Sequence, residues 1–199
     1  MTTALSIRRS ALRALLSMSA IATSLASAAP ANYTIDPEHT YPSFEASHMG
    51  ISMWRGKFDK SSGAARLDKD AQRGEVNIRV DLKSVDFGHA KLNQFMMGPE
   101  FFDTTKYRYG TYKGTLAGFV DGVPTRVDGA LTLHGVTKPL ALKINTFKCI
   151  PHPMLNRELC GADAFATFNR DDFGLDAGKS YGFSMEVVMR IQVEALKND

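Results

Sequence analysis

The sequence predicts an all-β protein, an antiparallel β-barrel of about eight strands with a short capping helix. Apolar and polar residues alternate with a period of two through most of the chain, which is typical of antiparallel strands with one buried and one wet face. Turn-forming residues separate these runs, and one short segment has the spacing of a helix instead. About eight to ten strands are enough to close a barrel, which removes exposed strand edges.

The alternation is clearest in three runs. Residues 76–82 place Val76, Ile78, Val80 and Leu82 on one face, and residues 140–144 and 183–193 repeat the pattern. The other predicted strands are shorter or less regular, and they cover residues 33–35, 43–49, 54–58, 64–67, 109–120, 125–133 and 162–168.

Local signals define one hairpin and one helix. Asp121-Gly122 separates two predicted strands, and both residue types tolerate the positive φ that a two-residue hairpin turn needs. Leu92, Phe95 and Met96 fall at i, i+3 and i+4, which is a helical stripe, and Gly98-Pro99 ends it. We expect this helix at a barrel end, where it caps the interior.

The first 28 residues have the organisation of a secretory signal peptide. Three arginines precede an apolar stretch over residues 14–25, and Ala26-Ser27-Ala28 matches a small-x-small cleavage site. The stretch is shorter than the roughly 20 residues of a membrane-spanning helix, so cleavage after Ala28 is favoured over an uncleaved anchor. Arg8-Arg9 also resembles a twin-arginine signal, but the Phe usual at the position of Ala11 is missing, which favours the general export route.

Loss of this leader changes the charge of the protein. The chain has 24 Lys and Arg against 21 Asp and Glu, and the three leader arginines account for the difference. The remaining residues 29–199 are formally neutral and have the length of one domain. A neutral domain without a Lys/Arg-rich run is not expected to bind nucleic acid or an anionic membrane surface.

Cys149 and Cys160 are the two cysteines of the chain. An even count in an exported protein favours a disulfide, and closing so short a loop would stabilise the fold by about 3 kcal/mol. A redox pair is the alternative, although the spacing is not C-x-x-C. No Cys/His pair lies nearby in the sequence, and no metal site is predicted.

An eight-stranded barrel is either filled by side chains or just wide enough for one small ligand. The chain has twelve Phe, nine Met, six Tyr and one Trp, enough for an ordinary core or for the lining of an apolar pore. Methionine in particular suits surfaces that accept a flexible apolar chain. The periodicity leaves both interpretations open.

No catalytic motif is found, and an enzyme is not predicted. The chain has no G-x-S-x-G elbow, P-loop or Rossmann glycine pattern. His48 shares a predicted strand face with Phe44, so it is expected to point inward. It is a structural histidine, a contact for a ligand's polar head or a pH-sensitive group, and the sequence leaves these roles open. A metal role for His39 or His48 is disfavoured because no carboxylate or Cys completes a cluster at ligand spacing.

Five segments share the order and spacing of one known family. They read YTIDPEHT from Tyr33, FEASHMGIS from Phe44, FFD from Phe101, GALTLHGVTKP from Gly129 and FNRDDFGL from Phe168. The chain thus resembles the YceI-like family, the polyisoprenoid-binding periplasmic proteins, over nearly its whole length after the leader. It departs from the family at residues 87–90 and in the segment that carries the two cysteines.

The resemblance implies a lipocalin-like barrel with an elongated apolar pore for a long isoprenoid, such as a polyprenyl or ubiquinone tail. Each buried CH₂ contributes about 0.8 kcal/mol, so a long tail supplies affinity without a catalyst or a required cofactor. We therefore expect a periplasmic binding or carrier protein for such a lipid. The residues expected to contact the ligand are Phe44, His48, Trp54, Phe58, Phe95, Phe101, Phe102, Tyr112, Leu131, Phe168 and Met185.

Two other functions stay open. In the first, a bound quinone serves electron transfer with a membrane cytochrome, a partner to which some family members are linked, although the chain has no C-x-x-C-H haem motif. In the second, the protein is an enzyme that acts on the bound lipid. The resemblance also implies a homodimer, for which the sequence gives no interface signal.

Overall fold

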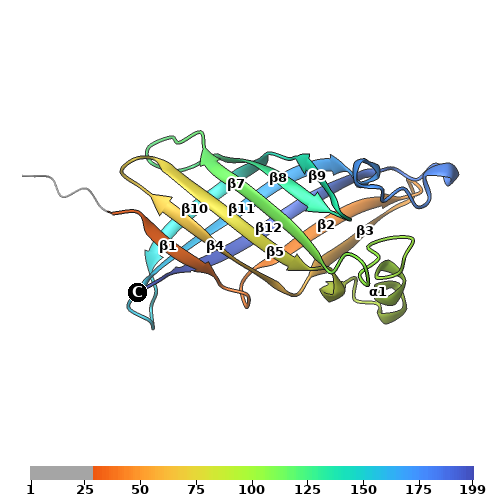
Figure 1. Cartoon of the computed structure of the whole chain (residues 1–199), viewed down its shortest axis with the longest axis horizontal. Helices are drawn as coiled ribbons and strands as arrows, with labels where there is room; N and C mark the ends of the chain where they lie inside the picture. Colours follow the sequence, from red (N-terminus) through yellow and green to blue (C-terminus); the bar gives the residue numbers. More distant parts are fainter. Residues whose placement is uncertain (1–28) are drawn as a thin grey trace, which may run out of the picture.

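The computed structural model describes residues 29–199, and the predicted signal peptide over residues 1–28 lies outside them (Figure 1). The described residues form one sheet of antiparallel strands that curls into an elongated barrel, with one α-helix at one end. The strands are β1 (Ala31–Ile35), β2 (Tyr41–His48), β3 (Ser52–Phe58), β4 (Ser61–Asp68), β5 (Arg73–Asp81), β6 (Val85–Asp86), β7 (Tyr109–Ala117), β8 (Arg126–Leu133), β9 (Val136–Pro139), β10 (Leu142–Pro151), β11 (Glu158–Asn169) and β12 (Glu186–Lys197).

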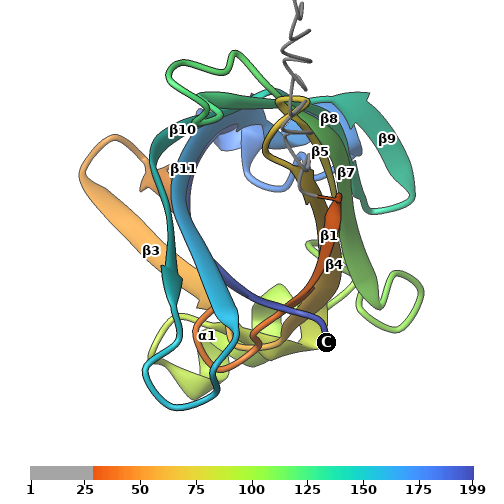
Figure 2. The same cartoon turned by 90° about the vertical axis from the view of Figure 1, so that its left-hand side faces the viewer.

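Eight of these strands close the ring, as predicted. Their order is β1-β4-β5-β7-β8-β10-β11-β12, and β12 pairs again with β1. Closure satisfies the backbone groups that a sheet edge would leave unpaired. Figure 2, which looks along the barrel from the end that carries the C-terminus, shows the ring of ribbons.

Strand β12 is long enough to pair with two strands in succession. Its C-terminal part pairs with β1, and its N-terminal part pairs with β2. Where the chain passes from β1 to β2, Asp36 N donates to Glu194 O at 2.9 Å, and Glu194 N donates to Thr40 Oγ1 at 3.1 Å. These bonds hold the barrel wall together across the break, and β2 and β3 extend the wall toward the helical end (Figure 1).

The predicted hairpin turn and the predicted helix are both confirmed. Asp121 and Gly122 have φ values of 51° and 78°, the left-handed conformation that this two-residue turn requires. Helix α1 (Ala90–Met96) begins after His89, whose Nδ1 accepts a hydrogen bond from Leu92 N at 3.2 Å. The helix lies at one end of the barrel, where Met96 belongs to the same apolar cluster as Phe58 and Phe102.

The strand boundaries differ most from the prediction in β10. The alternation of Leu140, Leu142 and Ile144 stops in the sequence, yet the strand continues to Pro151. A register shift between Ile144 and Thr146 inserts one residue, so the inward side chains change from even to odd positions, Phe147 and Cys149. A bulge of this kind breaks the period on which the sequence prediction depends.

The predicted disulfide is confirmed. Cys149 and Cys160 lie directly opposite each other on β10 and β11, and their sulfur atoms are bonded. Because the two strands are hydrogen-bonded neighbours, the bond fastens the hairpin at the end of the barrel opposite α1.

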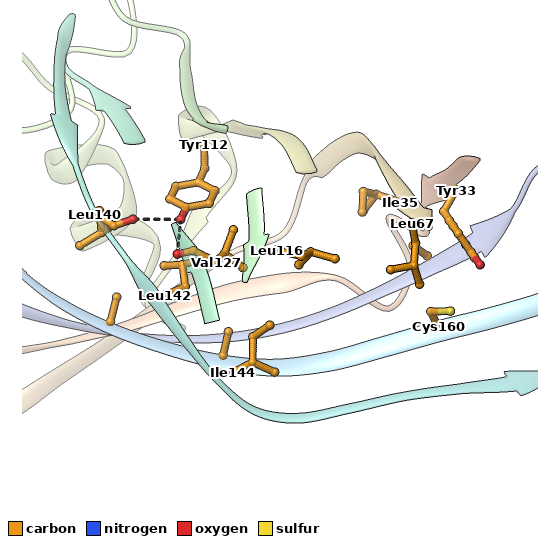
Figure 3. Packing of buried hydrophobic residues seen from close by; sticks show 13 residues of the cluster. Tyr33, Ile35, Leu67, Tyr112, Leu116, Val127, Leu140, Leu142, Ile144 and Cys160 are labelled. Atoms are coloured by element: carbon orange, nitrogen blue, oxygen red, sulfur yellow. Dashed lines mark hydrogen bonds between the residues drawn. The ribbon is translucent and has the colours of Figure 1, made fainter. Parts of the chain in front are cut away.

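The described residues contain no helix with the length and apolar character needed to span a bilayer. The apolar side chains instead gather on the inner face of the barrel in two clusters. One cluster, partly drawn in Figure 3, surrounds Tyr33, Leu67 and Cys160, and the other surrounds Phe44, Phe102 and Phe173 nearer to α1.

Candidate functional site: an apolar cavity inside the barrel

The inner face of the barrel encloses a cavity of about 550 Å³. Both apolar clusters contribute to its wall, so the side chains cover the wall but leave the axis of the barrel open. This volume lies within the range of pockets that bind small molecules. The sequence left open whether the barrel is filled or hollow, and the structure is hollow.

The cavity is long rather than round. On β12 the inward positions Val187, Met189, Ile191, Val193 and Ala195 all line it. The eight residue steps from Val187 to Ala195 extend about 26 Å, or about 20 Å along the axis of a barrel with tilted strands. Alternation in a tilted strand thus produces a continuous apolar track from one end of the barrel toward the other.

The cavity has its mouth at the helical end. Among its lining residues, those that are exposed are Trp54, Phe95, Glu100, Tyr181 and Ser184, and all of them belong to β3, α1 or the segments next to α1 and β12. Trp54 is 36% exposed and Tyr181 is 80% exposed.

The opposite end of the cavity is lined by buried side chains. Tyr33, Leu67 and Cys160 have exposures of 2%, 5% and 7%. The cavity is therefore exposed at the mouth and ends among buried residues at the opposite end.

Aromatic rings surround the mouth. The His48 imidazole stacks on the Trp54 indole with centroids 4.2 Å apart and an interplanar angle of 8°. Phe183 meets the His48 ring edge-on at 5.2 Å, and Phe87 lies edge-on to Trp54. Three segments of the chain, the β2–β3 hairpin, the segment before α1 and the segment before β12, thus contribute to one aromatic frame.

The hydroxyl groups deeper in the cavity are already bonded to the protein. Tyr112 Oη donates to Leu140 O at 2.9 Å and approaches Val127 O at 3.3 Å (Figure 3). Burial raises the pKa of the Tyr112 phenol, so it stays a neutral donor. Among the described residues no buried side-chain polar atom lacks a partner, so the interior presents an apolar surface to a guest.

Arg170 lines the cavity near the mouth but serves the fold. Its guanidinium donates to Leu175 O at 2.6 Å and to Ala177 O at 2.7 Å, which holds the segment between β11 and β12. Burial lowers the Arg170 pKa, although the neighbouring Asp171 and Asp176 oppose this effect. Asp171 pairs with Lys179 at 2.7 Å in the same segment. The Arg170 hydrogen bonds and the Asp171–Lys179 ion pair therefore hold this segment together.

The structure brings together all but one of the residues predicted to contact a ligand. Met185 is half-buried and does not line the cavity, because β12 begins at Glu186 and the alternation does not reach back to it. Ligand contact itself stays a prediction for every member of the set. The residues that line the cavity are Phe44, His48, Trp54, Phe58, Phe95, Phe101, Phe102, Tyr112, Leu131 and Phe168.

Several lining residues were missed by the sequence prediction. Tyr33, Leu142 and Met189 lie on predicted strands, and choosing one face of each strand would have found them. Phe87 lies before α1 and Tyr181 ends a short 3₁₀-helix (Lys179–Tyr181), and only the tertiary structure brings the two residues to the mouth.

Two clusters of metal-ligating residue types occur among the described residues. One consists of Glu158 and the two cysteines, whose sulfur atoms are bonded to each other. In the other, Asp36, His39 and Glu194 lie close together, although no carboxylate partner for His39 was predicted from the sequence. The His39 Nδ1 atom is 2.7 Å from Asp36 Oδ2 on an exposed turn, and this hydrogen bond and the Asp36 charge raise the His39 pKa. An ion pair accounts for this arrangement.

Together, the fold and the cavity define a class: closed antiparallel β-barrels with an elongated apolar cavity open at one end. The sequence model of the YceI-like domain matches residues 33–195. The chain therefore belongs to the YceI-like family, as its motifs predicted.

Curated relatives agree over most of the chain. A UPF0312 protein of Pectobacterium carotovorum is 32% identical over 192 residues, covering 93% of this chain and 97% of the relative. Protein YceI of Shigella flexneri is 32% identical over 179 residues, covering 87% of this chain and 91% of the relative.

Solved structures share the fold. The Campylobacter jejuni YceI protein superposes with a TM-score of 0.66 at 21% identity, covering 77% of this chain and 90% of that structure. A polyisoprenoid binding domain from Saccharophagus degradans superposes with a TM-score of 0.61 at 19% identity, covering 83% and 98%. At these identities the likeness concerns the fold alone.

Proposed function

We propose that this protein is a non-catalytic periplasmic carrier that holds one long-chain apolar lipid, of the polyisoprenoid or quinone-tail class, inside the barrel. The single observation that carries the proposal is the 550 Å³ apolar cavity, which runs along the barrel axis and opens at one end. The polyisoprenoid binding domain from Saccharophagus degradans has the same fold, which supports this ligand class. The leader-like sequence at residues 1–28 supports export.

The energetics favour an unbranched or methyl-branched hydrocarbon chain. Each CH₂ group removed from water contributes about 0.8 kcal/mol, so a long tail binds firmly without any polar contact. A polar group deep in the cavity would lose its hydrogen bonds to water and find the hydroxyl of Tyr112 already bonded to backbone carbonyls. The cavity therefore selects for length and apolar character. No metal or cofactor is needed for this binding.

Native mass spectrometry tests the proposal. The protein is expressed with its leader, purified from the periplasmic fraction without detergent, weighed intact, and then extracted with organic solvent for lipid identification. We expect a non-covalent adduct of one lipid per chain that carries an isoprenoid tail. A protein that carries no lipid and takes up none of a series of prenyl alcohols and quinones would overturn the proposal.

The same experiment addresses the redox function. Extraction identifies the bound lipid, and reductant is added to a separate sample of the intact complex. A quinone whose absorbance changes in that complex would favour electron transfer. A prenyl alcohol or a saturated chain would count against it.

A further inference from the structure

The polar atoms of the cavity wall are distributed unevenly along its length. The lining residues with a charged group or a ring nitrogen are His48, Trp54, Glu100 and Arg170, and all of them lie at the mouth. The far end is lined by Leu67, Cys160 and Ala195, together with the buried Tyr33. Tyr33 Oη is committed to Glu158 Oε1 at 2.5 Å. One end of the cavity is thus suited to a polar group and the other to a hydrocarbon.

His48 has the geometry of a group that contacts a guest at the mouth. Its ring is held between Trp54 and Phe183 by stacking and edge contacts, which fix its plane. No hydrogen bond within the described chain occupies its ring nitrogens, whereas His39, His134 and His152 each bond to the protein through Nδ1. The His48 imidazole can therefore donate to, or accept from, an oxygen atom of a guest.

The mouth offers little to a phosphate. Arg170 and Glu100 are the charged side chains of the lining, and the Arg170 guanidinium is already bonded to the carbonyls of Leu175 and Ala177. Phosphate recognition ordinarily uses cations that are free to form charge-assisted hydrogen bonds. Two of the five N–H donors of Arg170 are thus occupied, and the nearby Asp171 and Asp176 offset its charge. The Glu100 carboxylate in the lining would repel an anion.

We propose that the lipid binds in a single orientation, with an uncharged, oxygen-bearing head against His48 at the mouth and its tail ending beside Cys160. This inference rests on the proposed function and adds two properties of the guest, its orientation in the cavity and the chemical class of its head. The reversed guest would place its head among Leu67, Cys160 and Ala195, where it would lose its hydrogen bonds to water without replacement. A prenyl alcohol or a quinone fits this description, and a prenyl phosphate does not.

Trp54 is the single tryptophan of the chain and lies at the mouth, so its fluorescence reports on the nearby end of the guest. Two long-chain alcohols are titrated, one with a nitroxide quencher next to the hydroxyl and one with the nitroxide at the far end of the chain. We expect strong quenching by the first and weak quenching by the second at equal occupancy. Equal quenching, or stronger quenching by the tail-labelled alcohol, would overturn the orientation.

This experiment distinguishes a protein that binds no lipid from one that binds the lipid in the reversed orientation. Occupancy is measured independently by native mass spectrometry. If neither alcohol binds, the carrier function and the orientation both fail. If both bind but quench in the wrong order, the carrier function stands and only the orientation fails.

The variant His48→Phe tests the head contact. Phenylalanine keeps a ring between Trp54 and Phe183 but removes the hydrogen-bonding nitrogens. We expect the variant to bind a prenyl alcohol about threefold to tenfold more weakly than the wild type does, because one hydrogen bond is lost. The affinity for the matching hydrocarbon, which has no hydroxyl group, should stay unchanged. An equal change for both ligands, or no change for the alcohol, would contradict the contact. His39→Phe, outside the cavity, is the control and should alter neither affinity.

Discussion

The phenol of Tyr33 donates a 2.5 Å hydrogen bond to the carboxylate of Glu158 at the end of the barrel opposite the mouth. Lys69 Nζ lies 2.6 Å from the other carboxylate oxygen, so Glu158 on β11 is joined both to β1 and to the turn that follows β4. Burial by itself would raise the Glu158 pKa, but the hydrogen bonds from Lys69 and Tyr33 outweigh it and lower the pKa. Burial is also the largest cause that raises the pKa of Tyr33, which stays a donor.

Acidification is expected to weaken this end of the barrel. Because the Glu158 pKa lies below its ordinary value of 4.5, its contribution to stability is present above pH 4.5 and is lost as the pH falls through the lowered pKa. Urea unfolding at several pH values should show a steeper acid loss of unfolding free energy in the wild type than in Glu158→Gln. Identical acid limbs for the two proteins would contradict this role.

Reduction or removal of the disulfide is expected to destabilise the barrel without changing its fold. Cys149 and Cys160 are 11 residues apart in sequence, and opening a loop of this length costs about 3 kcal/mol in the chain-entropy model. The double variant Cys149→Ala, Cys160→Ala should lower the urea midpoint, and added reductant should lower the wild-type midpoint to match. A wild-type midpoint that reductant does not change would contradict the prediction.

The hydroxyl of Tyr112 is expected to stabilise the fold by about 1 kcal/mol, the usual net value of one buried hydrogen bond. Tyr112→Phe keeps the ring over Gly129 but leaves Leu140 O without this donor. Chemical denaturation checks the loss. Tyr181→Phe changes an exposed tyrosine and serves as the control, with no expected effect.

Arg170 is expected to control the order of the segment between β11 and β12, which forms part of the mouth. Arg170→Lys cannot reach both Leu175 O and Ala177 O with the same fork of donors, so the segment should open more often. Hydrogen exchange should become faster at the amides of residues 174–184 and stay unchanged in β5. Arg66→Lys, on an exposed strand position, is the matched control. Unchanged exchange at residues 174–184 would show that other contacts hold the segment.

The fold was largely predictable because alternation reports directly which face of a strand is buried. Val76, Ile78 and Val80 were assigned to one face from the sequence, and all three line the cavity. The prediction failed where the backbone departs from a regular strand. The bulge after Ile144 changes the inward parity of β10, and the start of β12 at Glu186 leaves Met185 off the wall.

The hollowness of the barrel could not be obtained from the sequence. Side chains such as Phe44 and Phe102 can either fill the barrel axis or leave it open. The outcome depends on the barrel radius and on the rotamers of neighbouring side chains, and a period-two pattern contains neither. The mouth also needed the structure, because Trp54, Phe95 and Tyr181 come from three separate segments. The pore was predicted from the family resemblance, because the alternation of apolar and polar residues does not predict it.

A side chain that fills the cavity tests most directly whether a lipid binds inside the barrel. Ala164 is 7% exposed on β11 and faces the middle of the cavity, so Ala164→Phe should occupy the space that a lipid chain needs. Thr167→Phe adds the same side chain at an exposed position of the same strand and is the control. We predict that titration with a prenyl alcohol shows at least tenfold weaker binding to Ala164→Phe and unchanged binding to Thr167→Phe. Wild-type affinity in a folded Ala164→Phe protein would contradict a guest inside the barrel.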